Sequence, residues 1–247
     1  MNHAVRSVLI VVPARDESAL LRGCLESIAG ARRFAEAVLD PAPYIHVVVV
    51  ADSCTDDTAA IAREFDRVNV VEVQAGTVGL ARATGVQLGL QRTRGERSRT
   101  WLANTDADSM VPRDWITVQL ELADTGTDVV LGTVRPDFAD LTQAQLEAWD
   151  ARHIPGVANG HIHGANLGIR ASSYLEAGGF HPLPEHEDVD LVDRLDARGA
   201  VIAPTTQCEV VTSGRGAGRT PGGYARYLQA ELLGSTPVSQ TATKGTP

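Results

Sequence analysis

Two aspartates separated by a single residue, Asp106 and Asp108, are the feature of this sequence best suited to chemistry. In extended backbone, residues i and i+2 point to the same side, so the two carboxylates can converge. Converged carboxylates repel each other at neutral pH unless a cation or a hydroxyl-rich ligand joins them. Mg²⁺ is typically held by one or two carboxylates together with substrate phosphates. The alternative is a polar turn ahead of a helix that Pro112 is suited to begin, and the D-x-D pattern alone leaves both open.

Polar clusters also follow three other apolar runs. They are residues 13–17, residues 52–58 and, after the third run, Gly76 with Arg82. One or two such residues would serve as helix caps, and Thr55 or Asp56 could be only that. Four successive clusters exceed what capping requires. Because ligands bind outside the carboxyl ends of strands in an open parallel sheet, we expect the clusters to line one ligand site.

The elements that must position these clusters alternate along the first half of the chain. Short apolar runs at residues 8–12, 45–50, 68–73, 101–104 and 129–134 are typical of strands buried on both faces. Apolar residues at helical spacing lie between them, at residues 20–28, 60–65 and 115–120. Strand–helix alternation predicts an α/β fold whose parallel sheet is covered on both faces.

Beyond residue 135 the alternation fades. We expect helices at residues 141–152, from about residue 172 and at 188–198, strands at 166–170, 201–203 and 208–212, and a loop at 153–165. The pattern predicts a single domain over residues 1–233, with an elaborated second half. Residues 234–247 are low in hydrophobicity and are predicted to form a disordered tail.

Composition excludes several classes of function. With 22 basic and 31 acidic residues the net charge is −9, which argues against a general nucleic-acid binder or a polybasic membrane-surface protein. The only lysine is Lys244, so a phosphate-loop NTPase, which needs a lysine in its loop, is excluded. No apolar run approaches the length of a membrane span, and Pro13 interrupts the first run too early for a signal peptide. Three widely spaced cysteines suggest no disulfide framework, and a cytoplasmic location is expected.

Taken in order, the motifs resemble those of the family 2 glycosyltransferases, nucleotide-sugar enzymes of the GT-A fold, over roughly residues 7–230. The matching segments are residues 13–17, 50–58, 76–85, 104–108, 164–170, 178–180 and 187–195. The resemblance implies a mixed, mostly parallel sheet flanked by helices. It also implies a nucleotide-binding half at about residues 7–134 and an acceptor and catalytic half at about 135–233.

The resemblance also assigns roles in donor binding. The base, ribose and nucleotide contacts it implies are Pro13, Arg15, Glu17, Asp52, Gly76 and Arg82. Asp106 would contact the sugar nucleotide, and Asp108 would hold a divalent cation, Mg²⁺ or Mn²⁺, bound to the diphosphate. Ala51 and Ser53 stand where the family more often has an acidic residue and glycine, which leaves the identity of the donor nucleotide open.

Catalysis is assigned by the same resemblance to the acidic segment at residues 187–188. Asp188, with Glu187 beside it, would deprotonate an acceptor hydroxyl for inverting transfer of a hexose. The chemistry fits the residue types, because a cation and an arginine can neutralise the departing diphosphate while a carboxylate activates the acceptor. Asp190 and Asp193 are expected to be solvated residues that favour the helix dipole. The sequence names neither the acceptor nor the oligomeric state.

Histidines and arginines in the second half leave two alternatives open. A zinc site would need His161, His163 and a distant histidine, but the helical i, i+4 pair and a cysteine partner are missing. Loop histidines or acceptor-site histidines are favoured instead, and His161 and His163 could contact an acceptor or the diphosphate. Arg215 and Arg219 lie in a glycine-rich stretch that is either a solvated loop or a lid over the diphosphate.

Two further functions compete with sugar transfer. A sugar nucleotidyltransferase would need a glycine-rich first loop with lysine, which residues 13–17 do not supply. A nucleotide-sugar-binding protein without turnover is disfavoured by the joint presence of Asp106, Asp108 and Asp188. The three tryptophans are expected in the core rather than at sugar-stacking positions.

Overall fold

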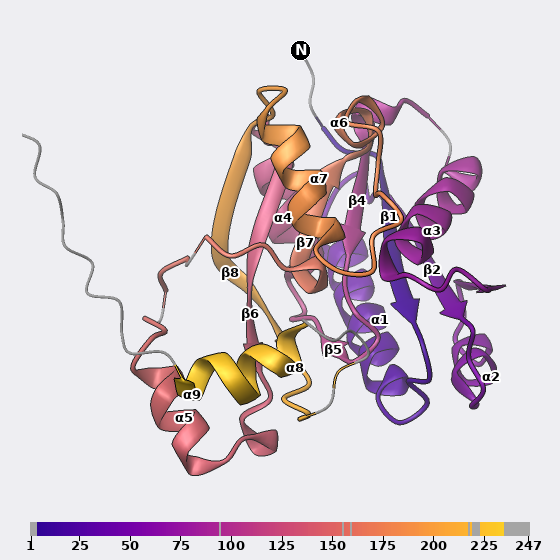
Figure 1. The fold of residues 1–247 in the computed structure, drawn as a ribbon. Coiled ribbons are helices and arrows are strands. Elements are labelled where there is room, and N and C mark those ends of the chain that lie inside the picture. The colour runs from indigo at the N-terminus through magenta and orange to yellow at the C-terminus, as the bar shows by residue number, and fades with distance from the viewer. Residues whose placement is uncertain are drawn as a thin grey trace, which may run out of the picture.

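The computed structural model describes residues 4–93, 95–154, 156–158, 160–216, 218 and 223–234. Within these residues the strands form one eight-stranded sheet in the order β3-β2-β1-β4-β7-β6-β8-β5 (Figure 1). The strands are β1 (Ser7–Ala14), β2 (Tyr44–Asp52), β3 (Val68–Val73), β4 (Thr100–Asn104), β5 (Ser109–Met110), β6 (Val129–Pro136), β7 (Leu167–Arg170) and β8 (Ile202–Thr212). The first four run parallel, and β7 pairs antiparallel with both β4 and β6. The predicted mixed, mostly parallel sheet is therefore confirmed.

Helices cover both faces of this sheet. They are α1 (Leu21–Val38), α2 (Thr58–Arg63), α3 (Val78–Arg92), α4 (Trp115–Asp124), α5 (Gln143–Asp150), α6 (Ala171–Glu176), α7 (Glu187–Asp196), α8 (Tyr224–Arg226) and α9 (Leu232–Gly234). Alternate residues of β1 point to opposite faces: Val8 and Ile10 pack with α1, α2 and α4, whereas Leu9 and Val11 pack with α3, α6 and α7. This double burial explains the continuous apolar runs of the strands.

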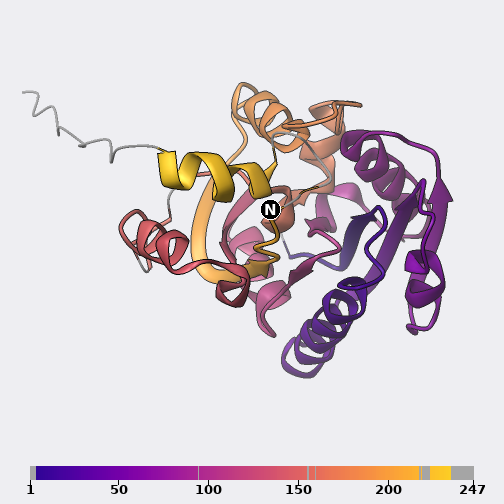
Figure 2. The same ribbon diagram turned by 60° about the horizontal axis from the view of Figure 1, so that its bottom comes forward.

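The strand order reverses between β1 and β4. The chain leaves β1 for β2 on one side, and β4 joins β1 on its other side. In such sheets the connections diverge at the reversal and leave a crevice at the carboxyl ends of the two strands. In Figure 1 the arrowheads of β1 and β2 point toward the bottom of the molecule, and Figure 2 turns that edge forward. The D-x-D segment follows β4 directly, so the fold places it at this crevice.

Helix α3 lacks a strong apolar stripe and was not predicted from the sequence pattern. Three glycines replace larger residues on its packed face, and each permits a close approach. A Cβ on Gly85 would lie 2.6 Å from Val11, one on Gly89 would lie 2.4 Å from Leu9, and one on Gly79 would lie 2.1 Å from the carbonyl oxygen of His181. Glycine lowers helix propensity but lets the helix lie directly on the sheet. That position carries Arg82 toward the strand ends.

Strand β8 also differs from expectation. The sequence predicts two short strands at 201–203 and 208–212, but the structure has one strand over Ile202–Thr212. The register against β6 shifts between Gly132 and Val134, which pair with Thr205 and Val210, so the extra residues of β8 form a bulge. Pro204 is tolerated because β8 has a second partner only at its far end, where β5 pairs with Val211 and Thr212.

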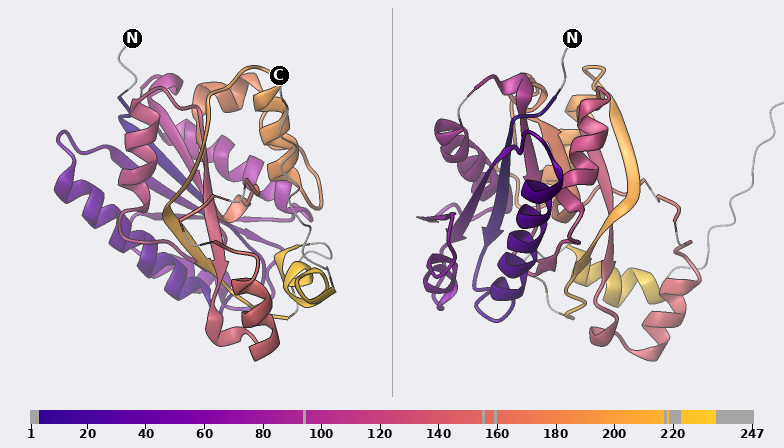
Figure 3. Two further views of the ribbon diagram at one scale, coloured as in Figure 1. Left: turned by 90° about the vertical axis from the view of Figure 1, so that its left-hand side faces the viewer. Right: turned by 180° about the vertical axis from the view of Figure 1, so that it is seen from behind.

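A small separate cluster joins α5 to the last described helical segment. This segment comprises α8, the π-helical turn η4 (Tyr227–Glu231) and α9. Trp149 of α5 packs there with Leu228 and Leu232, and all three are buried. Figure 3 shows the segment lying beside α5, at the same end of the molecule as the carboxyl ends of β1 and β2. Among the described residues, none of the helices combines the length and apolar character needed to cross a membrane.

Candidate functional site

A cavity of about 720 Å³ lies at the carboxyl ends of β1 and β4. All ten residues predicted to contact donor, metal or acceptor line it: Pro13, Arg15, Glu17, Asp52, Gly76, Arg82, Asp106, Asp108, Glu187 and Asp188. His161, His163 and Arg215 line it as well, whereas Arg219 lies outside the described residues. The fold thus brings together strand ends and second-half segments that are far apart in sequence, from Pro13 to Arg215.

Asp52 is buried at the end of β2 and holds the loop that follows β3. Its Oδ1 accepts hydrogen bonds from the backbone N–H groups of Ala75 (2.7 Å) and Gly76 (3.1 Å). Gly76 has φ of +75°, a conformation that glycine adopts without strain. Asp52 therefore shapes the rim of the cavity at Gly76 and Thr77, directly before α3.

Arg82 of α3 is the buried cation of the site, with 2% of its surface exposed. Its Nε donates to Glu187 Oε1 (3.0 Å), and its Nη2 donates to Asp106 Oδ1 (2.5 Å). Burial alone would lower the pKa of Arg82, but the neighbouring carboxylates raise it overall, so the guanidinium stays charged. Its Nη1 is buried with no hydrogen-bond partner among the described residues. A buried donor of this kind is suited to an anionic oxygen.

Glu187 is the partner that holds Arg82 in place. Its carboxylate is buried, and burial raises its pKa while Arg82 opposes that rise. Truncating one member of such a buried pair leaves the other charge uncompensated. The structure therefore gives Glu187 a positioning contact with Arg82.

Asp108 is enclosed by three groups that all lie on or next to β8. Its Oδ2 lies 3.0 Å from Arg215 Nη2, and its Oδ1 accepts from the hydroxyl of Thr212 at 3.3 Å. Its backbone oxygen accepts from the N–H of Ser213. Burial, followed by the charge of Asp106, raises the pKa of Asp108 to about 6. A divalent cation would relieve this cost, and oxygen ligands are those that Mg²⁺ and Mn²⁺ prefer, so the residues fit the expected metal.

Arg215 joins the turn after β1 to the D-x-D segment. Its two terminal nitrogens donate to the two oxygens of Glu17, at 2.7 and 2.6 Å, in a bidentate pair. Glu17 is buried at the turn after β1. Arg215 therefore faces the cavity, while residues 217 and 219–222 of the glycine-rich stretch lie outside the described residues, and both interpretations of the stretch stay predictions.

Asp188 lies in the first turn of α7 with part of its side chain exposed to the cavity. Its Oδ2 accepts a hydrogen bond from the backbone N–H of Gly164 at 2.6 Å, which fixes its orientation. A Cβ on Gly164 would lie 2.5 Å from Arg82 Nη2, so a larger residue would require the paired guanidinium to shift. Asp190, by contrast, pairs with Arg194 and His181 away from these contacts.

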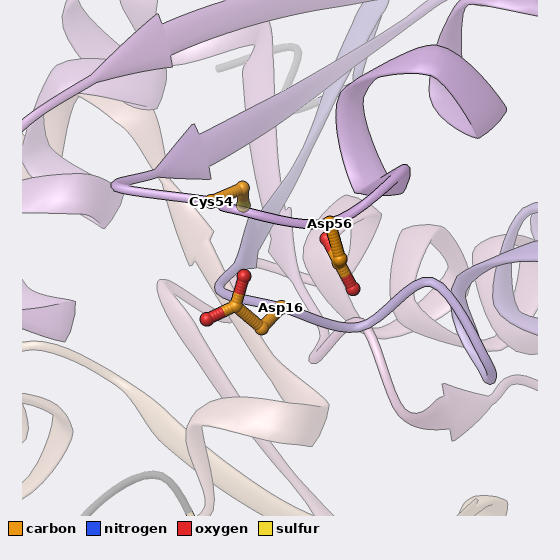
Figure 4. Close-up of side chains that lie close together, drawn as sticks. All are labelled: Asp16, Cys54 and Asp56. Atoms are coloured by element: carbon orange, nitrogen blue, oxygen red, sulfur yellow. The ribbon is translucent and has the colours of Figure 1, made fainter.

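The loops after β1 and β2 are held together by two aspartates. Asp16 accepts from the N–H of Thr55, and Asp56 accepts from the N–H of Ser18. With Cys54 they form the one group of three potential metal ligands found among the described residues, and their ligand atoms lie within 4.8 Å of one another (Figure 4). The hydrogen bonds between the loops explain why the two carboxylates lie close together. No histidine of the described residues belongs to such a group.

Several residues of the site were missed by sequence reasoning. Thr212 carries no motif, and its contact with Asp108 depends on the pairing of β5 with β8. Asn166 stands in a recognised motif, but its role is structural: its side chain donates to carbonyl groups of Thr133 and Cys208 and so fixes the turn that presents Gly164. Tyr224 and Tyr227 also line the cavity, and their periodicity gave no signal because η4 is a π-helical turn.

The prediction that Trp149 is a core residue was right but incomplete. It is 5% exposed and packs in the cluster with Leu228, as a core residue would. Its remaining surface lines the cavity. Trp101 and Trp115 are fully buried, as predicted.

Solved structures share this architecture. The mannosyltransferase PcManGT from Pyrobaculum calidifontis, in complex with GDP-Man and Mn²⁺, superimposes with a TM-score of 0.62 at 22% identity, covering 87% of this chain and 59% of that one. TarS residues 1–349 from S. aureus, in complex with UDP-GlcNAc, superimposes with a TM-score of 0.64 at 15% identity, covering 92% of this chain and 65% of that one. Glucosyl-3-phosphoglycerate synthase from Mycobacterium tuberculosis, in complex with phosphoglyceric acid, has a TM-score of 0.55 at 17% identity, covering 86% of this chain and 73% of that one. The chain thus spans about three fifths of the first two, and the similarity establishes the GT-A fold.

The sequence itself gives the family. A search of curated proteins finds no match. The family model for glycosyl transferase family 2 matches residues 9–173, more than half of the chain, and this range contains β1, the D-x-D segment and the Gly164 turn. The chain therefore belongs to glycosyl transferase family 2.

Proposed function

We propose that this protein transfers a hexose from a nucleoside-diphosphate sugar to a hydroxyl acceptor, with inversion at the anomeric carbon and with Mg²⁺ or Mn²⁺ as cofactor. The observation that carries the proposal is the convergence of Asp106, Asp108, Arg82 and Asp188 on one cavity at the β1/β4 reversal. Family membership and the nucleotide sugars bound by PcManGT and TarS support the same reaction class.

The D-x-D segment is proposed to hold the cation. Asp108 and Asp106 would be its protein ligands, and the metal would supply charge neutralisation to the departing diphosphate. Arg82 adds a fixed positive charge directly behind Asp106. The protein's only lysine lies at residue 244, so arginines supply the fixed positive charge around the diphosphate.

Asp188 is proposed as the general base. The acceptor hydroxyl gives its proton to the Asp188 carboxylate as its oxygen bonds to the anomeric carbon. The bond from that carbon to the diphosphate oxygen breaks on the opposite face, and the nucleoside diphosphate leaves. The Gly164 N–H holds Oδ2 of Asp188, Oδ1 accepts from the N–H of Val189, and Oδ1 is the oxygen proposed to take the acceptor proton.

A thermal-shift panel tests the proposal. UDP-, GDP-, dTDP- and CDP-sugars are added with Mn²⁺ or with a chelator, and one nucleotide class should raise the melting temperature only when Mn²⁺ is present. Asp108→Asn should lose that shift, whereas Asp193→Asn, an exposed carboxylate of α7, should keep it. A shift that persists in chelator, or in Asp108→Asn, would refute the metal assignment.

A further inference from the structure

The second half contributes a group of rings to the cavity, which we call the aromatic wall: Trp149, His153, His163, Tyr224 and Tyr227. These residues come from α5, from the segment after it, from the residue before η3 (Gly164–Asn166), and from α8 with η4. None belongs to a motif of the nucleotide-binding half. The wall therefore belongs to the part of the cavity that faces the acceptor.

Ring contacts join the wall into two groups, and Tyr224 and Tyr227 of the second group pack against the cluster that contains Trp149. His153 stacks on Trp149 with ring centroids 3.4 Å apart and planes inclined by 6°. His163 meets Tyr224 edge to face at 5.9 Å, and Tyr224 stacks on Tyr227 at 5.9 Å and 29°. Such pairs restrain one another, so the wall presents preformed ring surface rather than mobile side chains.

The backing of the wall is apolar and buried. Trp149 packs on Leu228 and Leu232, and Phe138 meets the Trp149 ring edge to face at 6.4 Å. Gln145 of α5 donates to the carbonyl of Leu228, which ties α5 to the last helical segment. The wall is therefore a built surface within the described part of the chain.

Charge distinguishes the wall from the donor side. The arginines among the described lining residues are Arg15, Arg82 and Arg215. Arg82 and Arg215 are already paired with carboxylates, and Arg15 lies beyond the end of β1. The carboxylate of Asp188 instead lies close enough to the wall to act on His163.

The imidazoles of the wall add no fixed positive charge at neutral pH. Burial, followed by the charge of His161, lowers the pKa of His163 to about 4. Burial also lowers the pKa of His153. An anionic acceptor would therefore meet neutral rings and carboxylates in this part of the cavity.

We propose that the acceptor is an uncharged, hydroxyl-bearing ring compound, which lays one flat face on the aromatic wall and directs its hydroxyl to Asp188. The proposal rests on the proposed function, because it takes Asp188 as the base. Donor and acceptor group share one cavity of about 720 Å³, so the part of the acceptor that enters is small. Charged acceptors such as phosphoglyceric acid, which the M. tuberculosis neighbour binds, are selected against here.

Binding is the primary test. The full chain is first saturated with Mg²⁺ and the nucleoside diphosphate identified by the thermal-shift panel, and then phenyl glucoside or phosphoglyceric acid is titrated by calorimetry. We expect phenyl glucoside to bind and phosphoglyceric acid to bind at least tenfold more weakly or not at all. Tighter binding of phosphoglyceric acid, or absence of phenyl glucoside binding, would overturn the proposal.

Variants locate the binding surface. Tyr224→Leu and, separately, Tyr227→Leu should weaken phenyl glucoside binding about fivefold, the loss expected for one aromatic contact, while nucleotide affinity stays within twofold. Tyr44→Leu, at an exposed tyrosine that does not line the cavity, is the matched control and should change neither. Unchanged phenyl glucoside affinity in both wall variants would refute the proposed surface.

The two proposals fail in different ways. Nucleotide binding is measured before any acceptor is added, so its absence would refute the proposed function by itself. Intact nucleotide binding with a preference for the anionic acceptor would refute only the inference about the aromatic wall.

Discussion

The donor side of the cavity and the aromatic wall are built by different means. On the donor side, charged residues lie at strand ends or on helices that reach them, and they are fixed by charged or backbone partners, as Arg82 of α3 is by Glu187 and Asp52 is by the Ala75 N–H. The wall is made of neutral rings on short helices and loops, which are fixed by one another. Strand ends suit the charged part that nucleotide sugars share, whereas loops and added helices can change with the acceptor.

Asp188 lies where the two regions meet, and its replacement should have the largest effect. Asp188→Asn keeps an oxygen that can accept from the Gly164 N–H but removes the base, so we expect turnover to fall about 10³-fold with donor affinity within twofold. Steady-state kinetics and calorimetry measure the two quantities. Asp193→Asn on the same helix should be silent, and more than a tenth of wild-type turnover in Asp188→Asn would contradict its role.

The charged side should depend on Arg82 for stability. Arg82→Met leaves Glu187 and Asp106 without their buried counter-charge, which should cost about 3–5 kcal/mol of unfolding free energy in urea. Arg63→Met is the matched control, because its pair with Glu72 is exposed, and it should cost less than about 1 kcal/mol. Equal costs for the two variants would remove the distinction between the buried charge network and surface ion pairs.

The wall should contribute a dependence on pH. The pKa of His163 is about 4 in the folded protein and about 6.5 when unfolded, so below pH 6.5 the unfolded chain binds the extra proton. The contribution of His163 to the free energy of unfolding should therefore be fully present above pH 6.5 and decline as pH falls toward 4. The expected loss is about 2 kcal/mol between pH 7 and pH 5. His163→Phe keeps a ring beside Tyr224 and should flatten this part of the curve in urea titrations. An unchanged pH dependence in the variant would show that His163 is not buried as described.

Two tyrosines give the smallest and sharpest contrast. The hydroxyl of Tyr174 accepts from the buried N–H of Phe180 at 3.1 Å, whereas the buried hydroxyl of Tyr224 has no partner among the described residues. Tyr174→Phe should therefore cost about 1–2 kcal/mol, and Tyr224→Phe should be neutral or slightly stabilising. If Tyr224→Phe lowers the free energy of unfolding as much as Tyr174→Phe does, the Tyr224 hydroxyl makes a hydrogen bond and the contrast is wrong.

Sequence reasoning predicted the charged side well because it depends on local order. Continuous apolar runs marked β1, β2 and β4, and the polar residues directly after them had to share one sheet edge. It missed α3 because glycines that serve close packing against β1 weaken a helical pattern. The pattern of apolar residues along the sequence does not show that Gly85 lies against Val11.

The aromatic wall could not be predicted in the same way. Trp149 and Tyr224 are far apart in sequence and meet only because the last helical segment packs on α5. Within the wall there is no spacing rule, since its rings come from a helix, a loop and a π-helical turn. A tryptophan that is both packed and cavity-lining is indistinguishable in sequence from one that is only packed.

The short pairing of β5 with β8 has a consequence for the behaviour of Arg215. Ser109 pairs with Thr212, and the Ser213 N–H bonds to Asp108, so the backbone two residues before Arg215 is fastened to the residue whose carboxylate it contacts. A tether of two residues spans less than about 8 Å, which keeps the guanidinium at a millimolar or higher effective concentration around Asp108. When a competing cation occupies Asp108, Arg215 stays close to the carboxylate because the chain holds it there. Arg215 therefore binds Asp108 again as soon as the competing cation leaves.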